Sequence, residues 1–135
     1  MYLNRLSYDK RQAFLSIAVS LVNSDGDFSE DEQTTLREYC GELLIPFEDV
    51  FTTSGKSLDV PADFLNNTCS EEEKKIVVFE LVGLAFADGE YRFEERTIIE
   101  IIAHKFCLSD DFLAYCEEFV VKLGELQREI NTLLF

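Results

Sequence analysis

The same helical pattern, ending in an acidic turn, occurs twice along this chain of 135 residues. The first turn reads SDGDFSEDE from Ser24, and the second reads ADGEYRFEE from Ala87. Asp25 and Asp88 hold the same place in the two turns, so the copies lie 63 positions apart (88 − 25). An apolar stripe of helical spacing precedes each turn at the same offset. The pattern constrains the chain to two similar helix–loop–helix hairpins, and we favour a duplication as their origin.

The first hairpin is expected to contain a helix over residues 8–23 and a second helix from Ser29 to Pro46. Gly26 can end the first helix, because glycine readily adopts the left-handed conformation of many helix ends. Ser29 and Glu32 have the spacing of a capping box. The expected inward-facing residues are Phe14, Leu15, Ala18, Leu21 and Val22, then Leu36, Tyr39, Cys40 and Leu43.

The second hairpin is expected to begin at Ser70, which forms another capping box with Glu73. Its second helix is expected over residues 93–106, after Gly89. Residues 46–69, between the hairpins, read as a connector with short helical turns that packs on the core. The expected inward-facing residues are Val77, Val78, Leu81, Leu84 and Ala85, then Ile98, Ile99, Ile102 and Phe106.

A last helical region is expected from Ser109 or Asp110 to the C-terminus, bent or divided at Gly124. Its apolar stripe is most readily explained as part of the core, and otherwise as a partner-binding or membrane-surface face. The stripe consists of Phe112, Leu113, Cys116, Phe119, Val120, Leu123, Leu126, Ile130, Leu133 and Leu134. With no strand-like alternation in the sequence, we predict an all-α fold: one helical bundle over residues 1–135.

The net charge of −15, from 27 acids and 12 bases, restricts the partners of this chain. Such a surface repels phosphate backbones and anionic membranes, so nucleic acid is not expected as a partner. The charge suits a cation, a basic protein or simple solubility. No apolar run reaches the ~18 residues of a membrane span, although peripheral association through a protein partner stays open. The absence of a signal peptide and four cysteines without paired spacing favour the cytoplasm.

Crowded acids make each turn a candidate cation site. Two carboxylates ~4 Å apart repel by about 4 kcal/mol at an effective dielectric constant of about 20, and a bound divalent cation relieves that repulsion. Oxygen ligands favour calcium or magnesium over zinc or copper. The turn acids are Asp25, Asp27, Glu30, Asp31 and Glu32 in the first copy, and Asp88, Glu90, Glu94 and Glu95 in the second.

Neither turn is an EF-hand. Counted from Asp25, the sixth position is Glu30 instead of glycine, and the twelfth is Leu36 instead of glutamate. A structural reading competes with metal binding. Asp-Gly is a common helix-ending turn, Glu32 and Glu95 stand where helix caps stand, and Phe28 and Tyr91 can plug the core. The two turns would then bind nothing.

These residues resemble the TerB-like family, named for the tellurite-resistance protein TerB. The family pattern is a helix ending in a small residue, then Asp-Gly, an acid, a hydrophobe and a glutamate within the next helix. Both turns fit this pattern, and the second lies in the typical LVGLAFADGE. The resemblance covers roughly residues 10–106. It implies an all-helical domain with pseudo-twofold halves, a stress-response role in the cytoplasm or at the inner membrane, and acidic metal-binding clusters.

The resemblance also implies a ligand set. Asp31 and Glu94 are second-rank candidates, and Arg92, which replaces the polar Ser29 of the first turn, partly neutralises the second turn. The candidate metal ligands are Asp25, Asp27, Glu32, Asp88, Glu90 and Glu95.

We therefore expect a TerB-like stress-response module that binds calcium or magnesium and acts as an adaptor or regulatory domain for a protein partner. The alternative is a metal-independent interaction domain whose acidic surface docks a basic protein. Metal-assisted hydrolysis ranks below both, and we do not expect an enzyme. His104, the only histidine, belongs to no recognisable catalytic arrangement and is expected to face solvent or to cap a helix.

Overall fold

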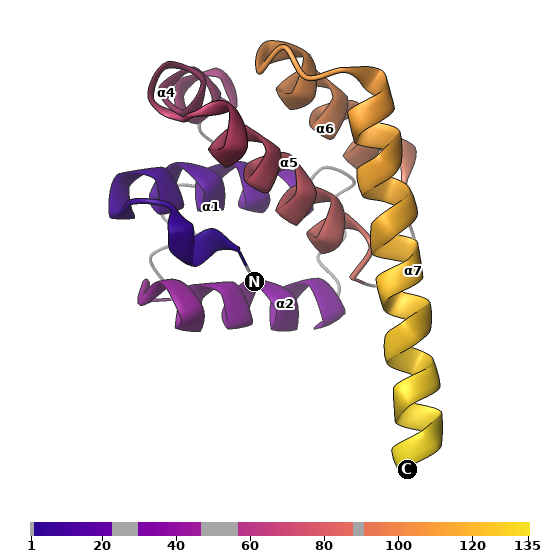
Figure 1. The fold of residues 1–135 in the computed structure, drawn as a ribbon. Coiled ribbons are helices and arrows are strands. Elements are labelled where there is room, and N and C mark those ends of the chain that lie inside the picture. Colours follow the sequence, from indigo (N-terminus) through magenta and orange to yellow (C-terminus); the bar gives the residue numbers. More distant parts are fainter. Residues whose placement is uncertain (1, 23–29, 47–56, 88–90) are drawn as a thin grey trace.

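The computed structural model describes residues 2–22, 30–46, 57–87 and 91–135, without the side chains of Asp31 and Glu32. Within these ranges the chain forms a 3-10 helix, η1 (Leu3–Arg5), and α-helices, and it contains no strand (Figure 1). This confirms the all-α fold. The α-helices are α1 (Tyr8–Val22), α2 (Glu30–Leu43), α4 (Asp59–Thr68), α5 (Glu71–Ala85), α6 (Phe93–Lys105) and α7 (Asp110–Leu134).

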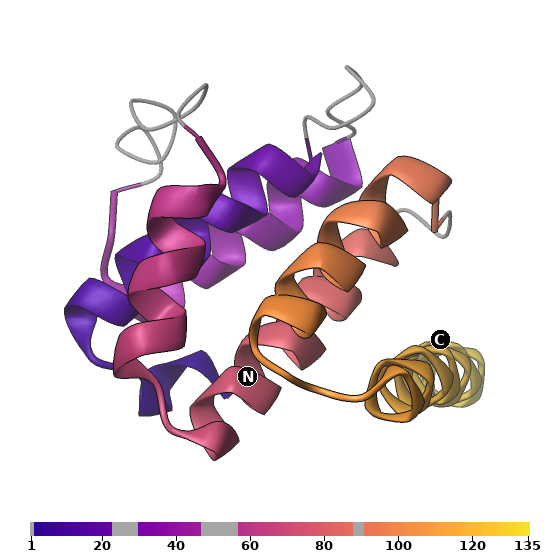
Figure 2. The same ribbon diagram turned by 90° about the horizontal axis from the view of Figure 1, so that it is seen from above.

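Helices α1 and α5 form the centre of the molecule. Helix α1 contacts α2, α4, α5 and α6, while α5 contacts η1, α1, α2, α6 and α7. Both are apolar around most of their circumference, as expected for helices that neighbours cover on several sides. Figure 2, which looks along α7, shows that helix beside α5 and α6. The centre of the core is therefore the α1–α5 contact, and α7 covers one flank.

The predicted inward-facing residues of the hairpins form this core. All five in α1 and all five in α5 are buried. In α2 and α6 the innermost side chains are buried, and Tyr39 and Ile98 pack against the core while partly exposed. The helical periodicity of the sequence thus identified the correct faces.

The helix bounds follow the 63-residue offset of the sequence. Helices α1 and α5 each have 15 residues and begin 63 positions apart (71 − 8). Helices α2 and α6 begin at Glu30 and Phe93, again 63 positions apart (93 − 30). Duplication of the hairpin remains a prediction that these matching bounds favour.

The ends of α2 and α6 also correspond. Leu44 and Cys107 both have a φ of 59°, the left-handed conformation that usually falls to glycine. The next amides then reach back across the last turn: the Ile45 N–H donates to the Cys40 carbonyl at 3.0 Å, and the Leu108 N–H donates to the Ala103 carbonyl at 2.9 Å. Both hairpins therefore end in a Schellman motif without glycine.

The connector between the hairpins is more regular than the sequence indicated. We expected short turns, but α4 is a 10-residue helix whose Ala62 and Leu65 are buried. It packs on α1 and α6. Pro61 is tolerated because the N–H groups of a first helical turn need no intrahelical acceptor. Residues 47–56 of the connector lie outside the described part.

Helix α7 corrects the prediction that its whole apolar stripe is core. Leu113 and Cys116 are buried, but Phe119 is 54%, Leu126 51% and Leu133 83% exposed. At about 1.5 Å per residue the 25-residue α7 is ~37 Å long, whereas the 15-residue α5 offers ~22 Å of support. The C-terminal half of α7 consequently projects past the bundle (Figure 1). Gly124 neither divides nor ends this helix.

Candidate functional site

The candidate metal ligands belong to the junctions between α1 and α2 and between α5 and α6. Asp25, Asp27, Asp88 and Glu90 lie outside the described residues, and Glu32 is described only as part of α2. Glu95 is the candidate whose side chain the structure describes. The described helices still show how the turns are approached, and what surrounds the second one.

The two helices that lead into the turns run in the same general direction. In Figures 1 and 2, α1 and α5 cross the bundle with their C-terminal ends on the same side. Near their N-terminal ends, Lys10 of α1 lies 3.0 Å from both carboxylate oxygens of Glu73 in α5. Lys10 and Glu73 are themselves 63 positions apart (73 − 10), so this pair joins corresponding places in the two hairpins. The hairpins therefore leave their central helices toward a common side.

Glu95 is a buried carboxylate in the first turn of α6. Its side chain is 2% exposed, and its Oε1 accepts a hydrogen bond from the Arg92 N–H at 3.1 Å. This is the half of a capping box that a glutamate supplies. The other half of a capping box needs an N-cap side chain that accepts from the Glu95 N–H, and the Arg92 guanidinium carries only donors. Glu95 therefore caps α6 through its Oε1, as the structural reading predicted.

Two aromatic residues, Phe86 and Tyr91, flank the Asp-Gly segment of the second acidic turn in the sequence. The rings of Phe86 and Tyr91 lie 4.5 Å apart between centroids, and both pack on the core. Tyr91 therefore does plug the core, as the structural reading expected; its counterpart Phe28 lies outside the described residues. Burial first, and then Glu117, raise the pKa of Tyr91 above its ordinary value, so its hydroxyl stays protonated.

Arg96, one helical turn after Arg92, forms ion pairs with two glutamates. Its Nε and Nη2 contact the two carboxylate oxygens of Glu117 in α7 at 3.0 and 3.2 Å, and its Nη1 pairs with Glu100. The hydrogen bond to Glu117 is the main reason that the pKa of Arg96 is raised. Two carboxylates thus neutralise this cation, and it fixes α6 to α7.

No group of three or more potential metal ligands gathers within the described ranges. Glu94, a second-rank candidate, is exposed. The side chain of Asp31, the other one, is not described. Any cation site at the turns consequently depends on acids whose side chains the structure does not describe, within residues 23–29, 31–32 and 88–90, together with Glu95.

Other ionisable groups outside the turns serve the fold. The Ser70 hydroxyl accepts from the Glu73 N–H at 3.2 Å, and Glu73 accepts from the Ser70 N–H at 2.9 Å, which confirms this predicted capping box. Glu80, 4% exposed, accepts from the Tyr2 N–H at 2.9 Å and so ties the N-terminal segment to α5. His104 is exposed and lies 2.8 Å from Asp110 at the start of α7, where the sequence had placed it in solvent or at a cap.

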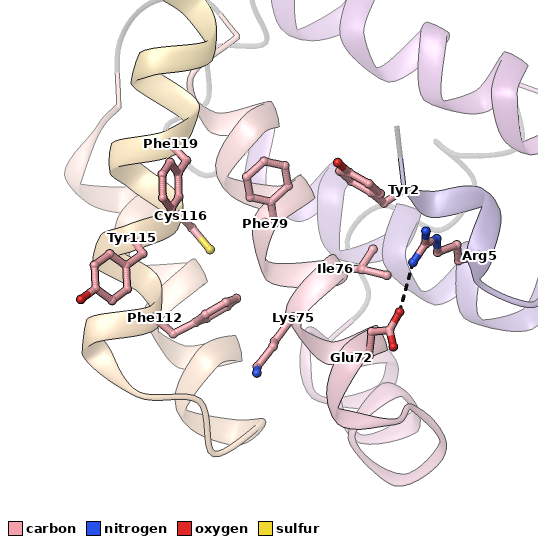
Figure 3. Close-up of a pocket in the computed structure, with 10 residues that line it drawn as sticks. All are labelled: Tyr2, Arg5, Glu72, Lys75, Ile76, Phe79, Phe112, Tyr115, Cys116 and Phe119. Atoms are coloured by element: carbon pink, nitrogen blue, oxygen red, sulfur yellow. Dashed lines mark hydrogen bonds and ion pairs between the residues drawn. The ribbon is translucent and has the colours of Figure 1, made fainter.

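A groove of about 530 Å³, which sequence reasoning missed, lies between α5, α7 and the N-terminal segment (Figure 3). We call it the α5–α7 groove. Its lining is mostly apolar and includes none of the candidate metal ligands. The lining residues are Tyr2, Arg5, Glu72, Lys75, Ile76, Phe79, Phe112, Tyr115, Cys116 and Phe119. The signal in the sequence was the spacing of the stripe along α7.

Among the described helices, none combines the length and the apolar character needed to cross a membrane. Comparison with curated proteins and with solved structures returns no match. Residues 1–53, which include η1, α1 and α2, match the family model described as Tellurite resistance protein TerB. Together with the all-helical fold, this match supports a TerB-like family for the chain.

Proposed function

We propose that this chain is a cytoplasmic stress-response module that binds a divalent cation, calcium or magnesium, through its two acidic turns. The family match over residues 1–53 supports a module related to tellurite resistance. The cation and the role of adaptor for a protein partner are our inference. The proposed ligands are Asp25, Asp27, Glu32, Asp88, Glu90 and Glu95.

The observation that carries this proposal is the common direction of α1 and α5. Because both helices end on the same side of the bundle, the Asp-Gly segments that follow them start from that side. Carboxylates from both hairpins can then approach one another, and a hard cation would offset their repulsion. Glu95 adds support, since a divalent cation bound nearby would stabilise a carboxylate that is buried at this place.

A thermal-unfolding titration tests the proposal. A cation that binds only the folded chain adds about 2.7 kcal/mol of stability at 100 times its dissociation constant. We expect calcium or magnesium to raise the melting temperature at constant ionic strength. Asp25→Ala and Asp88→Ala should each abolish that rise, whereas the control Glu125→Gln, an exposed acid on α7, should retain it. A melting temperature that calcium, magnesium and manganese all leave unchanged would refute cation binding.

A metal-independent interaction domain is the second candidate. The net charge of −15 favours it, because a basic protein surface is attracted to such a chain without any metal. Hydrogen bonding of Glu95 as a helix cap also suits it, since this role requires no cation. Under this alternative, binding of a basic partner would weaken with salt and would be insensitive to chelators.

A further inference from the structure

Seven apolar residues of α7 have the spacing of a coiled-coil seam. Their positions alternate between steps of four and three along the helix, which is the a/d pattern of a heptad repeat. Leu113 and Val120, which pack in or against the core, and Leu134 lie beside these seven positions. The seam consists of Phe112, Cys116, Phe119, Leu123, Leu126, Ile130 and Leu133.

The seam begins inside the bundle and continues past its edge. Cys116 is 3% exposed, whereas Leu123 is 47%, Leu126 51% and Leu133 83% exposed. Burial of these side chains against a partner would favour association through the hydrophobic effect. The projecting half of α7 therefore presents a continuous apolar face of the width of one helix.

The α5–α7 groove continues this face. Phe112, Cys116 and Phe119 belong to the seam and also line the groove, and Ile76 and Phe79 of α5 line its other side (Figure 3). Its volume of about 530 Å³ has room for apolar side chains from the end of an incoming helix. A helix that follows the seam toward the bundle would thus end in a prepared apolar recess.

The charge distribution favours a second copy of the chain as the occupant. The chain as a whole carries −15, but residues 122–135 balance Lys122 and Arg128 against Glu125 and Glu129, with a net charge of zero. A basic partner would be drawn to other surfaces, whereas two copies of this acidic chain repel each other least along this segment. A strongly charged partner helix would find no excess of opposite charge on this segment. An identical helix can pair its lysine with the glutamate of the first copy.

We propose that the α7 helices of two copies pair as an antiparallel coiled coil, with the tail of each copy in the α5–α7 groove of the other. The register that sets Leu123 opposite Leu126 of the second copy also sets Cys116 opposite its Leu133. Leu133 then enters the groove. The same register places Lys122 beside Glu129 of the second copy, twice by symmetry.

The rim of the groove is complementary to this tail. Arg5 and Lys75 stand at the rim, where Arg5 pairs with the exposed Glu72 and Lys75 pairs with the exposed Glu71. The C-terminal end of a helix carries partial negative charge from its unbonded carbonyls. The end of α7 from the second copy would bring that charge to the two cations.

Sedimentation equilibrium of the full chain under reducing conditions, which keep its free cysteines unlinked, tests the pairing. We expect a dimer that Leu126→Glu weakens by at least about tenfold, because the substitution buries a charge in the seam. The matched control is Val121→Glu, a change to the same residue at a position 40% exposed on α7 but outside the seam. It should leave the dimer intact. A wild-type chain that stays monomeric at its highest soluble concentration, as it would if a different protein covered the seam, overturns the proposal.

Charge reversal tests the orientation. Lys122→Glu and Glu129→Lys should each weaken the dimer severalfold, and the double variant should restore it, because the antiparallel register brings these two residues together. Lys122 also pairs with Glu118 of its own helix at 2.8 Å, so circular dichroism should show that α7 remains folded in each variant. Additive weakening in the double variant would contradict this register.

Discussion

Leu44 and Cys107 hold a backbone conformation that L-amino acids rarely adopt. Each has a φ of 59°, and this conformation lets carbonyls in the last turn of the preceding helix accept hydrogen bonds from the amides that follow. A side chain in this region costs about 1–2 kcal/mol, which glycine avoids. The residues that follow, Ile45 and Leu108, are only 7% and 8% exposed, so the turn also places an apolar side chain in the core.

Leu44→Gly should therefore stabilise the chain by up to about 1 kcal/mol, since relief of strain exceeds the extra entropy of glycine in the unfolded state. Leu44 is 84% exposed, so little packing is lost. Urea unfolding at neutral pH measures the difference. The control Leu44→Ala removes the same side chain but keeps Cβ, and it should not stabilise. Equal stabilities for the glycine and alanine variants would contradict strain at this position.

Glu73 should make the chain sensitive to acid. The Ser70 N–H first, and then Lys10, lower the pKa of Glu73 below its ordinary value. A lowered pKa means that the ionised form stabilises the fold above the unfolded pKa of about 4.3, and that this contribution is lost as pH falls through the folded pKa. Glu73→Gln should cost about 1–2 kcal/mol at pH 7, with a smaller difference from wild type near pH 3.

Urea unfolding at several pH values gives this difference. The matched control is Glu72→Gln, whose carboxylate is 73% exposed and pairs with Arg5, and which should change stability by less than about 0.5 kcal/mol at any pH. A Glu73→Gln penalty that does not vary with pH would contradict a contribution from the ionised carboxylate of Glu73.

At the scale of elements, α7 divides into a supported half and a projecting half. Leu113, 2% exposed, packs in the core, whereas Leu126 is 51% exposed on the projecting half. Leu113→Ala should cost about 2–5 kcal/mol. Leu126→Ala should change the stability of the monomer by less than about 0.5 kcal/mol. Chemical unfolding of dilute chain measures both, and comparable losses would mean that the two halves are equally buried.

These same elements show what the sequence can predict. The faces of α1 and α5 followed from periodicity, and the Ser70 cap followed from spacing, because both depend on neighbours along the chain. The exposure of the C-terminal half of the α7 stripe did not follow from periodicity, because periodicity identifies an apolar face without revealing what covers it. Helix α4 was underestimated since packing of Ala62 and Leu65 outweighs its weak local signals.

The candidate site was predictable to a similar degree. The spacing that suggests Glu95 as a metal ligand is also the spacing of a helix cap, and the structure shows the cap. The bidentate contact between Arg96 and Glu117 was invisible in the sequence, because its partners lie 21 positions apart on separate helices. Sequence can therefore name the charged residues of a turn and of the helix after it, but not the partners that other helices supply.

At the scale of the whole molecule, 27 acids outnumber 12 bases. The excess negative side chains should repel one another in the folded state and lower its stability. Raising the ionic strength from about 0.01 to 0.15 M shortens the Debye length from about 30 to 8 Å and screens that repulsion. We expect the melting temperature to rise over this range with a monovalent salt. A fall would mean that the ion pairs between helices outweigh the net charge.

Cation binding by the two turns together is the central claim, and nuclear magnetic resonance tests it most directly. Calcium or magnesium titrated into the ¹⁵N-labelled chain at constant ionic strength should shift amides in residues 24–32 and 87–95 together, along one saturating curve. Asp25→Ala should abolish the shifts in both segments, because a shared ion needs ligands from both hairpins. Shifts confined to one segment, or weak shifts that never saturate, would contradict a joint site.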